Sequence, residues 1–81
     1  MKLPRDLSGA DLVKALRRVG YEMIRQTGSH IRVATSERGP HHVTVPAHNP
    51  MKVGTLSGIL GDVAAHLEIS RNELVRRLFG L

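Results

Sequence analysis

The fold is decided by the stretch YEMIRQTGSHIRVATSERGPHHVTV, Tyr21–Val45. Three of its segments are rich in β-branched or aromatic residues, or alternate apolar with polar side chains, and both patterns favour strands. The predicted strands are 21–26, 29–35 and 41–45. Thr27-Gly28 and the polar run 36–40 carry turn signals. Consecutive strands joined by short turns predict a three-stranded antiparallel sheet.

The middle segment indicates which face of this sheet is buried. Ile31 and Val33 point to one face, whereas His30, Arg32 and Ala34 point to the other. We expect the face with Ile31 and Val33 to pack against the core, because burying apolar surface is the main driving force of folding. His30 is therefore expected on the open face, directly after a tight turn.

Amphipathic helices are predicted on both sides of this stretch. The first, 9–19, begins after a capping-box pair, Ser8 and Asp11, and ends at Gly20. Its apolar stripe consists of Leu12, Val13, Leu16 and Val19. The second helix, 55–67, has apolar side chains at helical spacing. They are Leu56, Ile59, Leu60, Val63 and Leu67.

A short third helix is predicted near the end of the sequence. It follows a second capping-box pair, Ser70 and Glu73, and ends at Gly80. The order α-β-β-β-α with a short extra C-terminal helix predicts an α+β fold with both main helices on one face of the sheet. This is the layout of a double-stranded-RNA-binding-type domain, and we expect residues 1–81 to form a single domain of this kind.

The composition favours a polyanionic partner. Twelve Lys and Arg against seven Asp and Glu give a net charge of +5. One Tyr, one Phe and no Trp cannot form a stacking platform for bases, so contacts to phosphates, 2′-hydroxyls and helix shape are expected. The absence of Cys excludes thiol nucleophiles and thiolate metal sites. We find neither a signal-peptide pattern nor a membrane-length apolar run, and expect a cytoplasmic protein.

His30 is the leading candidate for a catalytic residue. An imidazole titrates near neutral pH, so it can accept the proton of an RNA 2′-hydroxyl or donate one to the leaving oxygen. Arg25 and Lys52 are expected as phosphate-binding neighbours. Ser29 and the backbone amide of Gly28 are expected to hydrogen-bond the substrate or to orient the imidazole. The competing interpretation is that His30 is an ordinary solvated strand residue.

The basic side chains of the first helix form a second candidate surface. Lys14, Arg17 and Arg18 lie opposite the apolar stripe, where they either contact RNA or form the solvated side of the helix. No metal or other cofactor is expected. His41 and His42 are adjacent in a strand and point to opposite faces, and no helical His pair or carboxylate cluster accompanies them.

An ordered series of short motifs resembles the HicA toxins, the mRNA-interferase half of HicAB toxin–antitoxin pairs. The motifs are RRVGYEMIRQ, TGSH, HHVTVPAH, KVGTLSGIL and EISRNEL, and the similarity runs from Ser8 to about Leu78. The resemblance implies a double-stranded-RNA-binding-like fold and metal-independent cleavage of mRNA. It also implies a catalytic histidine at His30, within the Gly-Ser-His motif, and a HicB antitoxin that covers the active site.

Two departures from the family pattern shift the expected RNA contacts. Asp62, together with glycines in the second helix, and Ala47 occupy places where the family commonly has basic side chains. We therefore expect RNA affinity to depend on the first helix and on three further residues. These are Arg25, Arg32 and Lys52.

Three hypotheses about function follow from the sequence. The leading one is a ribonuclease toxin in which His30 transfers a proton on the RNA backbone. The alternative is a non-catalytic RNA-binding module of the same fold, whose duplex binding would be steeply salt-dependent and would proceed without cleavage. The third is a protein-interaction domain that docks through the open face of the sheet.

Overall fold

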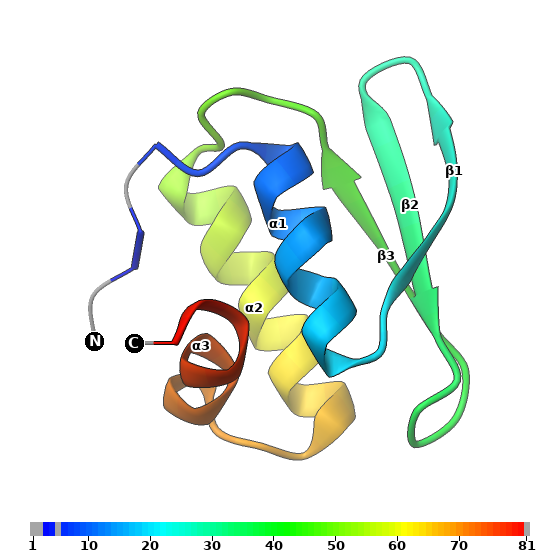
Figure 1. Ribbon diagram of the computed structural model, residues 1–81, viewed down its shortest axis with the longest axis vertical. Helices are drawn as coiled ribbons and strands as arrows, with labels where there is room; N and C mark the ends of the chain where they lie inside the picture. Colours follow the sequence, from blue (N-terminus) through cyan, green and yellow to red (C-terminus); the bar gives the residue numbers. More distant parts are fainter. Residues whose placement is uncertain (1–2, 5, 81) are drawn as a thin grey trace.

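The computed structural model describes residues 3–4 and 6–80, and Figure 1 shows α1 and α2 packed on one side of a three-stranded sheet. The elements in chain order are α1 Gly9–Leu16, η1 Arg17–Val19, β1 Glu22–Thr27, β2 His30–Thr35, β3 His41–Pro46, α2 Val53–Leu67 and α3 Arg71–Phe79. This order confirms the predicted α-β-β-β-α arrangement with an extra C-terminal helix. α3 packs against α1, η1 and α2.

Several element boundaries differ from the predicted ones. β1 is Glu22–Thr27 rather than 21–26, and β3 ends at Pro46 rather than at residue 45. α2 begins at Val53 rather than at residue 55, because Lys52 already has the extended backbone of an N-cap. The last part of the predicted helix 9–19 is the 3₁₀ turn η1, which ends at Gly20 with φ of 97°. Ser29 lies in the hairpin turn and not in a strand, so β2 begins at His30.

The sheet is antiparallel with the order β1-β2-β3, and its inner face is built from β2 and β3. Ile31 pairs with Val45 and Val33 pairs with Val43, and all four side chains are buried beneath the helices. His30 and Arg32 are exposed. The alternation in the sequence therefore predicted the buried and open faces of β2 correctly.

β1 lies beyond the helical layer at one edge of the sheet, and all six of its residues are exposed. The register shifts between Met23 and Arg25, which marks a bulge at Ile24. Met23 is 48% exposed and Ile24 is 54% exposed, although both are large apolar side chains. The bulge explains why this segment alternates imperfectly in the sequence.

The core lies between the sheet and the helices and extends under α3. Its fully buried side chains include Leu12, Leu16, Tyr21, Leu60, Val63, Leu74 and Leu78. Each of these side chains removes apolar surface from water, which stabilises the fold by about 25 cal/mol per Å² buried. Among the described residues, no helix is both long enough and apolar enough to cross a membrane.

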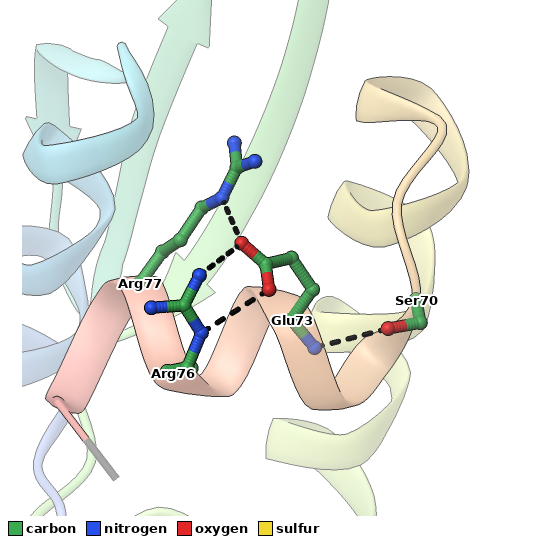
Figure 2. A network of polar contacts seen from close by, with 4 residues as sticks. All are labelled: Ser70, Glu73, Arg76 and Arg77. Atoms are coloured by element: carbon green, nitrogen blue, oxygen red, sulfur yellow. Dashed lines mark hydrogen bonds and ion pairs between the residues drawn. The ribbon is translucent and has the colours of Figure 1, made fainter.

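The two predicted capping boxes differ in the structure. At α1 both bonds form: Asp11 N donates to Ser8 Oγ (3.0 Å), and Ser8 N donates to Asp11 Oδ2 (3.2 Å). At α3 Glu73 N donates to Ser70 Oγ (3.0 Å), but the Glu73 carboxylate turns to Arg76 and Arg77 instead of back to Ser70 (Figure 2). The second prediction was therefore half right, because two arginines compete for the carboxylate.

Candidate functional site

His30 is the first residue of β2 and follows a two-residue loop. Thr27 and His30 are the closing pair of the hairpin, and Gly28 and Ser29 form its turn. Gly28 has φ of 57°, a left-handed conformation that glycine adopts without a steric penalty. The turn thus places the exposed His30 side chain at the end of the sheet, on its open face.

The backbone around His30 is held from the neighbouring strand and from α1. His30 pairs with Pro46, and beyond this pair Ala47 N donates to the Ser29 carbonyl oxygen (2.6 Å). The Gly9 amide in turn donates to the carbonyl oxygen of His48 (2.9 Å). The strand end that carries His30 is therefore tied to the loop after β3, and that loop is tied to the start of α1.

Gly9 makes this close approach possible, and sequence reasoning missed it. A Cβ atom at position 9 would overlap the Pro46 carbonyl group, so only glycine fits at this point. The residue is buried although it is the first residue of a helix. A lone glycine after a capping serine gives no distinctive signal, because the approach involves chain segments far apart in the sequence.

Two arginines lie beside His30 on the open face. Directly paired residues share a face, so the pairings in the sheet define two neighbouring cross-strand rows there. The rows are Arg25–Arg32–Thr44 and Thr27–His30–Pro46. His30 and Arg32 are two residues apart on one strand, a separation of roughly 7 Å. An anion bound between Arg25 and Arg32 would lie next to the His30 imidazole.

The Arg25–Arg32 pair is an unfavourable arrangement for the fold alone. Like charges placed directly opposite each other on two strands destabilise a sheet, by a few tenths of a kcal/mol up to about 1 kcal/mol. No carboxylate forms an ion pair with either arginine among the described residues. The open face therefore carries concentrated positive charge beside a histidine, which is an arrangement suited to a phosphate.

The other predicted basic residues do not join this site. Lys14, Arg17 and Arg18 are exposed on α1 and η1, which belong to the helical layer behind the sheet (Figure 1). Arg18 is directed to α3, where its Nη1 donates to the Leu78 carbonyl oxygen (3.0 Å). Lys52 is exposed at the N-cap of α2, also in the helical layer. The predicted RNA contacts thus divide between two surfaces.

The side chains of Ser29 and His30 are not hydrogen-bonded to each other in the described part of the chain. Within residues 3–4 and 6–80, no side-chain hydrogen bond involves the His30 imidazole or the Ser29 hydroxyl. At this turn a side chain does contact the backbone, since Gln26 Nε2 donates to the Gly28 carbonyl oxygen (3.3 Å). Both groups are therefore oriented by the backbone and remain available to a substrate.

A separate polar cluster lies on the helix side of the sheet. Tyr21 Oη is 2.7 Å from His41 Nδ1, and His41 Nε2 is 3.4 Å from Asp62 Oδ1. Burial, reinforced by the negative charge of Asp62, raises the pKa of Tyr21 to about 12. His66 stacks on His41 with 4.2 Å between ring centroids. His41 faces this cluster whereas His42 is exposed, which confirms that the two point to opposite faces.

His66 also holds the turn between β2 and β3. Its Nε2 lies 2.8 Å from the Glu37 carbonyl oxygen and 3.2 Å from that of Gly39, so this nitrogen donates its hydrogen to the turn. No group of three or more His, Asp or Glu side chains in the described part of the chain is placed to hold a metal ion.

Comparison with known protein families decides the classification of this chain. The family model described as HicA toxin of bacterial toxin-antitoxin matches residues 9–64, more than half of the sequence. The chain belongs to the HicA toxin family. It is thus the toxin of a bacterial toxin–antitoxin pair. Neither the curated proteins nor the solved structures include a significant match to it.

The segment matched to the HicA family contains every element of the site around His30. It begins at Gly9, includes all three strands and the Gly28–Ser29 turn, and ends within α2. α3 lies outside the matched segment. The family assignment therefore covers the open face of the sheet and the helices that support it.

Proposed function

We propose that this HicA toxin is a metal-independent endoribonuclease that cleaves mRNA, with His30 as the catalytic acid–base residue. The observation that carries the proposal is the placement of Arg25 and Arg32 beside His30 on the open face. A proton-transfer group next to two phosphate-binding groups is what cleavage of the RNA backbone requires. Membership of a toxin family supports a target whose destruction arrests growth, as that of mRNA does.

The chemistry is an in-line attack within the substrate. The 2′-oxygen forms a bond to phosphorus, and the bond from phosphorus to the 5′-oxygen of the next nucleotide breaks. The 2′-hydroxyl loses a proton and the departing 5′-oxygen gains one. His30 carries out one of these two transfers, and solvent water carries out the other. Arg25 and Arg32 donate hydrogen bonds to the non-bridging oxygens, where negative charge develops. The products are a 2′,3′-cyclic phosphate and a 5′-hydroxyl.

We further propose that the antitoxin of this pair is a HicB-type protein that covers the open face. That face is uncovered in the isolated chain, and its histidine and arginines are exposed. A partner seated there excludes RNA from His30 and neutralises the Arg25–Arg32 repulsion. Binding would therefore both inhibit the toxin and stabilise its fold, by mass action.

The experiment compares His30→Ala with the unmodified protein, using His42→Ala as the matched control. His42 is a second exposed histidine on the open face, paired with Ala34 and so removed from the row that holds His30. We expect His30→Ala to lose RNA cleavage and growth arrest, and His42→Ala to keep both. Equal activity of His30→Ala and the unmodified protein would contradict the catalytic assignment.

A second measurement tests the mechanism. An RNA with a single 2′-deoxy nucleotide before the scissile phosphate has no nucleophile, so we expect it to resist cleavage while binding normally. The alternative function, a non-catalytic RNA-binding module, is favoured by the basic residues of α1 and η1, which lie away from His30. RNA binding without cleavage by the unmodified protein would establish that alternative.

A further inference from the structure

A hollow at the far end of the molecule from His30 is lined by three arginines from three different elements. Arg18 comes from η1, Arg38 from the turn between β2 and β3, and Arg77 from α3. Leu67 and Ile69 contribute apolar surface to the same hollow. We call it the arginine hollow. The cleavage mechanism proposed above involves neither Arg38 nor Arg77.

Each of the three guanidinium groups is already oriented by a contact with the protein. Arg18 Nη1 donates to the Leu78 carbonyl oxygen (3.0 Å), and Arg38 Nη1 donates to Glu68 Oε2 (2.6 Å). Arg77 contacts Glu73 Oε2 through its Nε alone (2.7 Å). Figure 2 shows its two terminal nitrogens extending beyond the carboxylate. A planar guanidinium held in this way keeps further N–H groups for a ligand and loses little entropy on binding it.

The charge of Arg77 is not cancelled by its partner. Glu73 is shared between Arg76 and Arg77, at 2.6 and 2.7 Å, so one carboxylate faces two guanidinium groups. The hollow also includes Glu37, which offsets part of the remaining charge. Arg18 adds a guanidinium whose described hydrogen bond is to a neutral carbonyl group. Glu68 likewise offsets the charge of Arg38. The four arginines (Arg18, Arg38, Arg76 and Arg77) therefore face three carboxylates (Glu37, Glu68 and Glu73), and the one positive charge in excess favours an anion.

The backbone at Arg38 has a left-handed conformation. Arg38 has φ of 55°, a left-handed conformation that disfavours residues with a Cβ atom. The next residue, Gly39, also has a positive φ, of 95°. Two successive positive φ values are typical of a tight turn, and this turn carries the Arg38 side chain to the hollow.

The path from His30 to the hollow follows β2. His30 opens this strand, Arg32 lies on its open face, and Arg38 follows in the turn after Thr35. The five residue steps from His30 to Thr35 span roughly 17 Å, at about 3.3 Å per residue. This distance is too long for one phosphate to contact both ends. A nucleic-acid strand, which carries a phosphate at every nucleotide, can reach both at once.

We propose that the arginine hollow binds a backbone phosphate of the RNA substrate, several nucleotides away from the phosphate cleaved at His30. This inference rests on the proposed ribonuclease function and extends it to substrate length. An acidic peptide offers carboxylates to the same guanidinium groups, but it does not account for the second pair of arginines, Arg25 and Arg32, on the open face of the same strands. The hollow thus sets a minimum length of RNA for tight binding.

The test uses Arg77→Gln and Arg38→Gln, with Arg76→Gln as the matched control. Arg76 and Arg77 are adjacent and share Glu73, but only Arg77 lines the hollow. All three changes are made in His30→Ala protein, and binding of a fluorescent 20-nucleotide RNA is measured by anisotropy over a range of salt concentrations. Thermal unfolding of each variant shows whether it is folded.

We expect Arg77→Gln and Arg38→Gln each to weaken RNA binding by about 3- to 10-fold and to lower the slope of log K against log salt by about 0.7, the value for one phosphate of a single strand. Arg76→Gln removes a charge outside the hollow but leaves Glu73 to Arg77 alone, so its loss should be clearly smaller than that of Arg77→Gln, at less than about 2-fold. Equal losses in all three variants, or no loss in any, would overturn the proposal.

Two further outcomes separate this inference from the function on which it rests. Because the readout is binding by a variant that lacks His30, RNA that is bound but never cut by the unmodified protein contradicts only the proposed catalysis. Efficient cleavage together with equal effects of Arg76→Gln and Arg77→Gln contradicts only the role of the hollow. If Arg77→Gln weakens binding of a polyglutamate peptide and leaves RNA binding unchanged, the hollow is a peptide site and the RNA proposal is wrong.

Discussion

Arg25 and Arg32 face each other directly across β1 and β2, on the side of the sheet that no helix covers. The pairing depends on the bulge at Ile24, which shifts the register so that these two residues become partners. Their repulsion lowers the stability of the hairpin, and an anion bound between them removes it. The pair therefore connects the shape of β1 to the proposed binding of a phosphate beside His30.

Arg25→Gln separates the functional role of this pair from its structural one. We expect it to raise the free energy of unfolding by about 0.2–1 kcal/mol, because a like-charge pair is removed, and to lower the rate of RNA cleavage. Urea denaturation and a cleavage assay on the same preparation give the two values. Arg71→Gln, on the exposed surface of α3, is the control and should change neither by much. A destabilised Arg25→Gln protein would show that the arginines support the fold.

Gly9→Ala tests the contact between α1 and the loop after β3. The added methyl group would overlap the Pro46 carbonyl, so the helix and the strand end that pairs with His30 must move apart. We expect a loss of about 1–3 kcal/mol of stability, as for other overpacked sites, and reduced cleavage.

Gly58→Ala is the control for this change. Gly58 lies inside α2, and a Cβ atom there meets nothing within 4 Å. Alanine is the better helix former by up to about 1 kcal/mol, so we expect Gly58→Ala to stabilise the protein. Thermal unfolding of both variants compares them directly. A Gly9→Ala protein as stable as the unmodified one would mean that α1 does not constrain this strand end.

Tyr21 provides a pH-dependent signal, because it is the only tyrosine in the chain. Its pKa is raised to about 12 by burial and by Asp62, whereas an unfolded tyrosine ionises at about 10. The folded protein then holds its proton where the unfolded chain has lost it. This contribution to stability is complete below about pH 10 and is lost as the pH rises towards 12.

Absorbance of tyrosinate measures this shift. For the folded protein we expect the absorbance to rise with a midpoint near pH 12. If alkaline unfolding exposes the ring first, the absorbance rises abruptly at that pH. The same chain in concentrated urea should titrate near 10. Equal midpoints in the two conditions would contradict the burial of the Tyr21 hydroxyl against His41.

The pKa of Glu73 is shifted in the opposite direction from that of Tyr21, so its effect on stability appears at acidic pH. Hydrogen bonds from Arg76 and Arg77 lower the pKa of its carboxyl group below the usual 4.5. The stabilisation from this group is therefore present above the unfolded value and disappears as the pH falls through the lowered pKa. We expect both Arg76→Gln and Arg77→Gln to move the pKa of Glu73 back towards 4.5, measured by carbon-13 NMR of the carboxylate. A pKa of Glu73 that neither change affects would show that the contact with both arginines in Figure 2 does not form in solution.

The sequence by itself determined the elements of this protein and which side of them is buried. The spacing of Leu12 and Leu16 in α1, and of Leu60 and Val63 in α2, predicted helices whose apolar stripes are buried. The alternation around Ile31 predicted the open face that carries His30. These features follow from the periodicity of apolar residues along the sequence. The face of a helix or strand on which a residue lies is set by its spacing from nearby residues in the sequence.

Only the tertiary structure decided which residues meet. The bulge in β1 pairs Arg25 with Arg32, and the close approach of α1 to Pro46 explains Gly9. The convergence of Arg18, Arg38 and Arg77 likewise joins segments that are distant in the sequence. Register and packing depend on the partner strand or helix as much as on the chain itself, and no local period encodes them. The net charge of the protein can therefore be read from its composition, whereas the two phosphate sites that we propose depend on the fold.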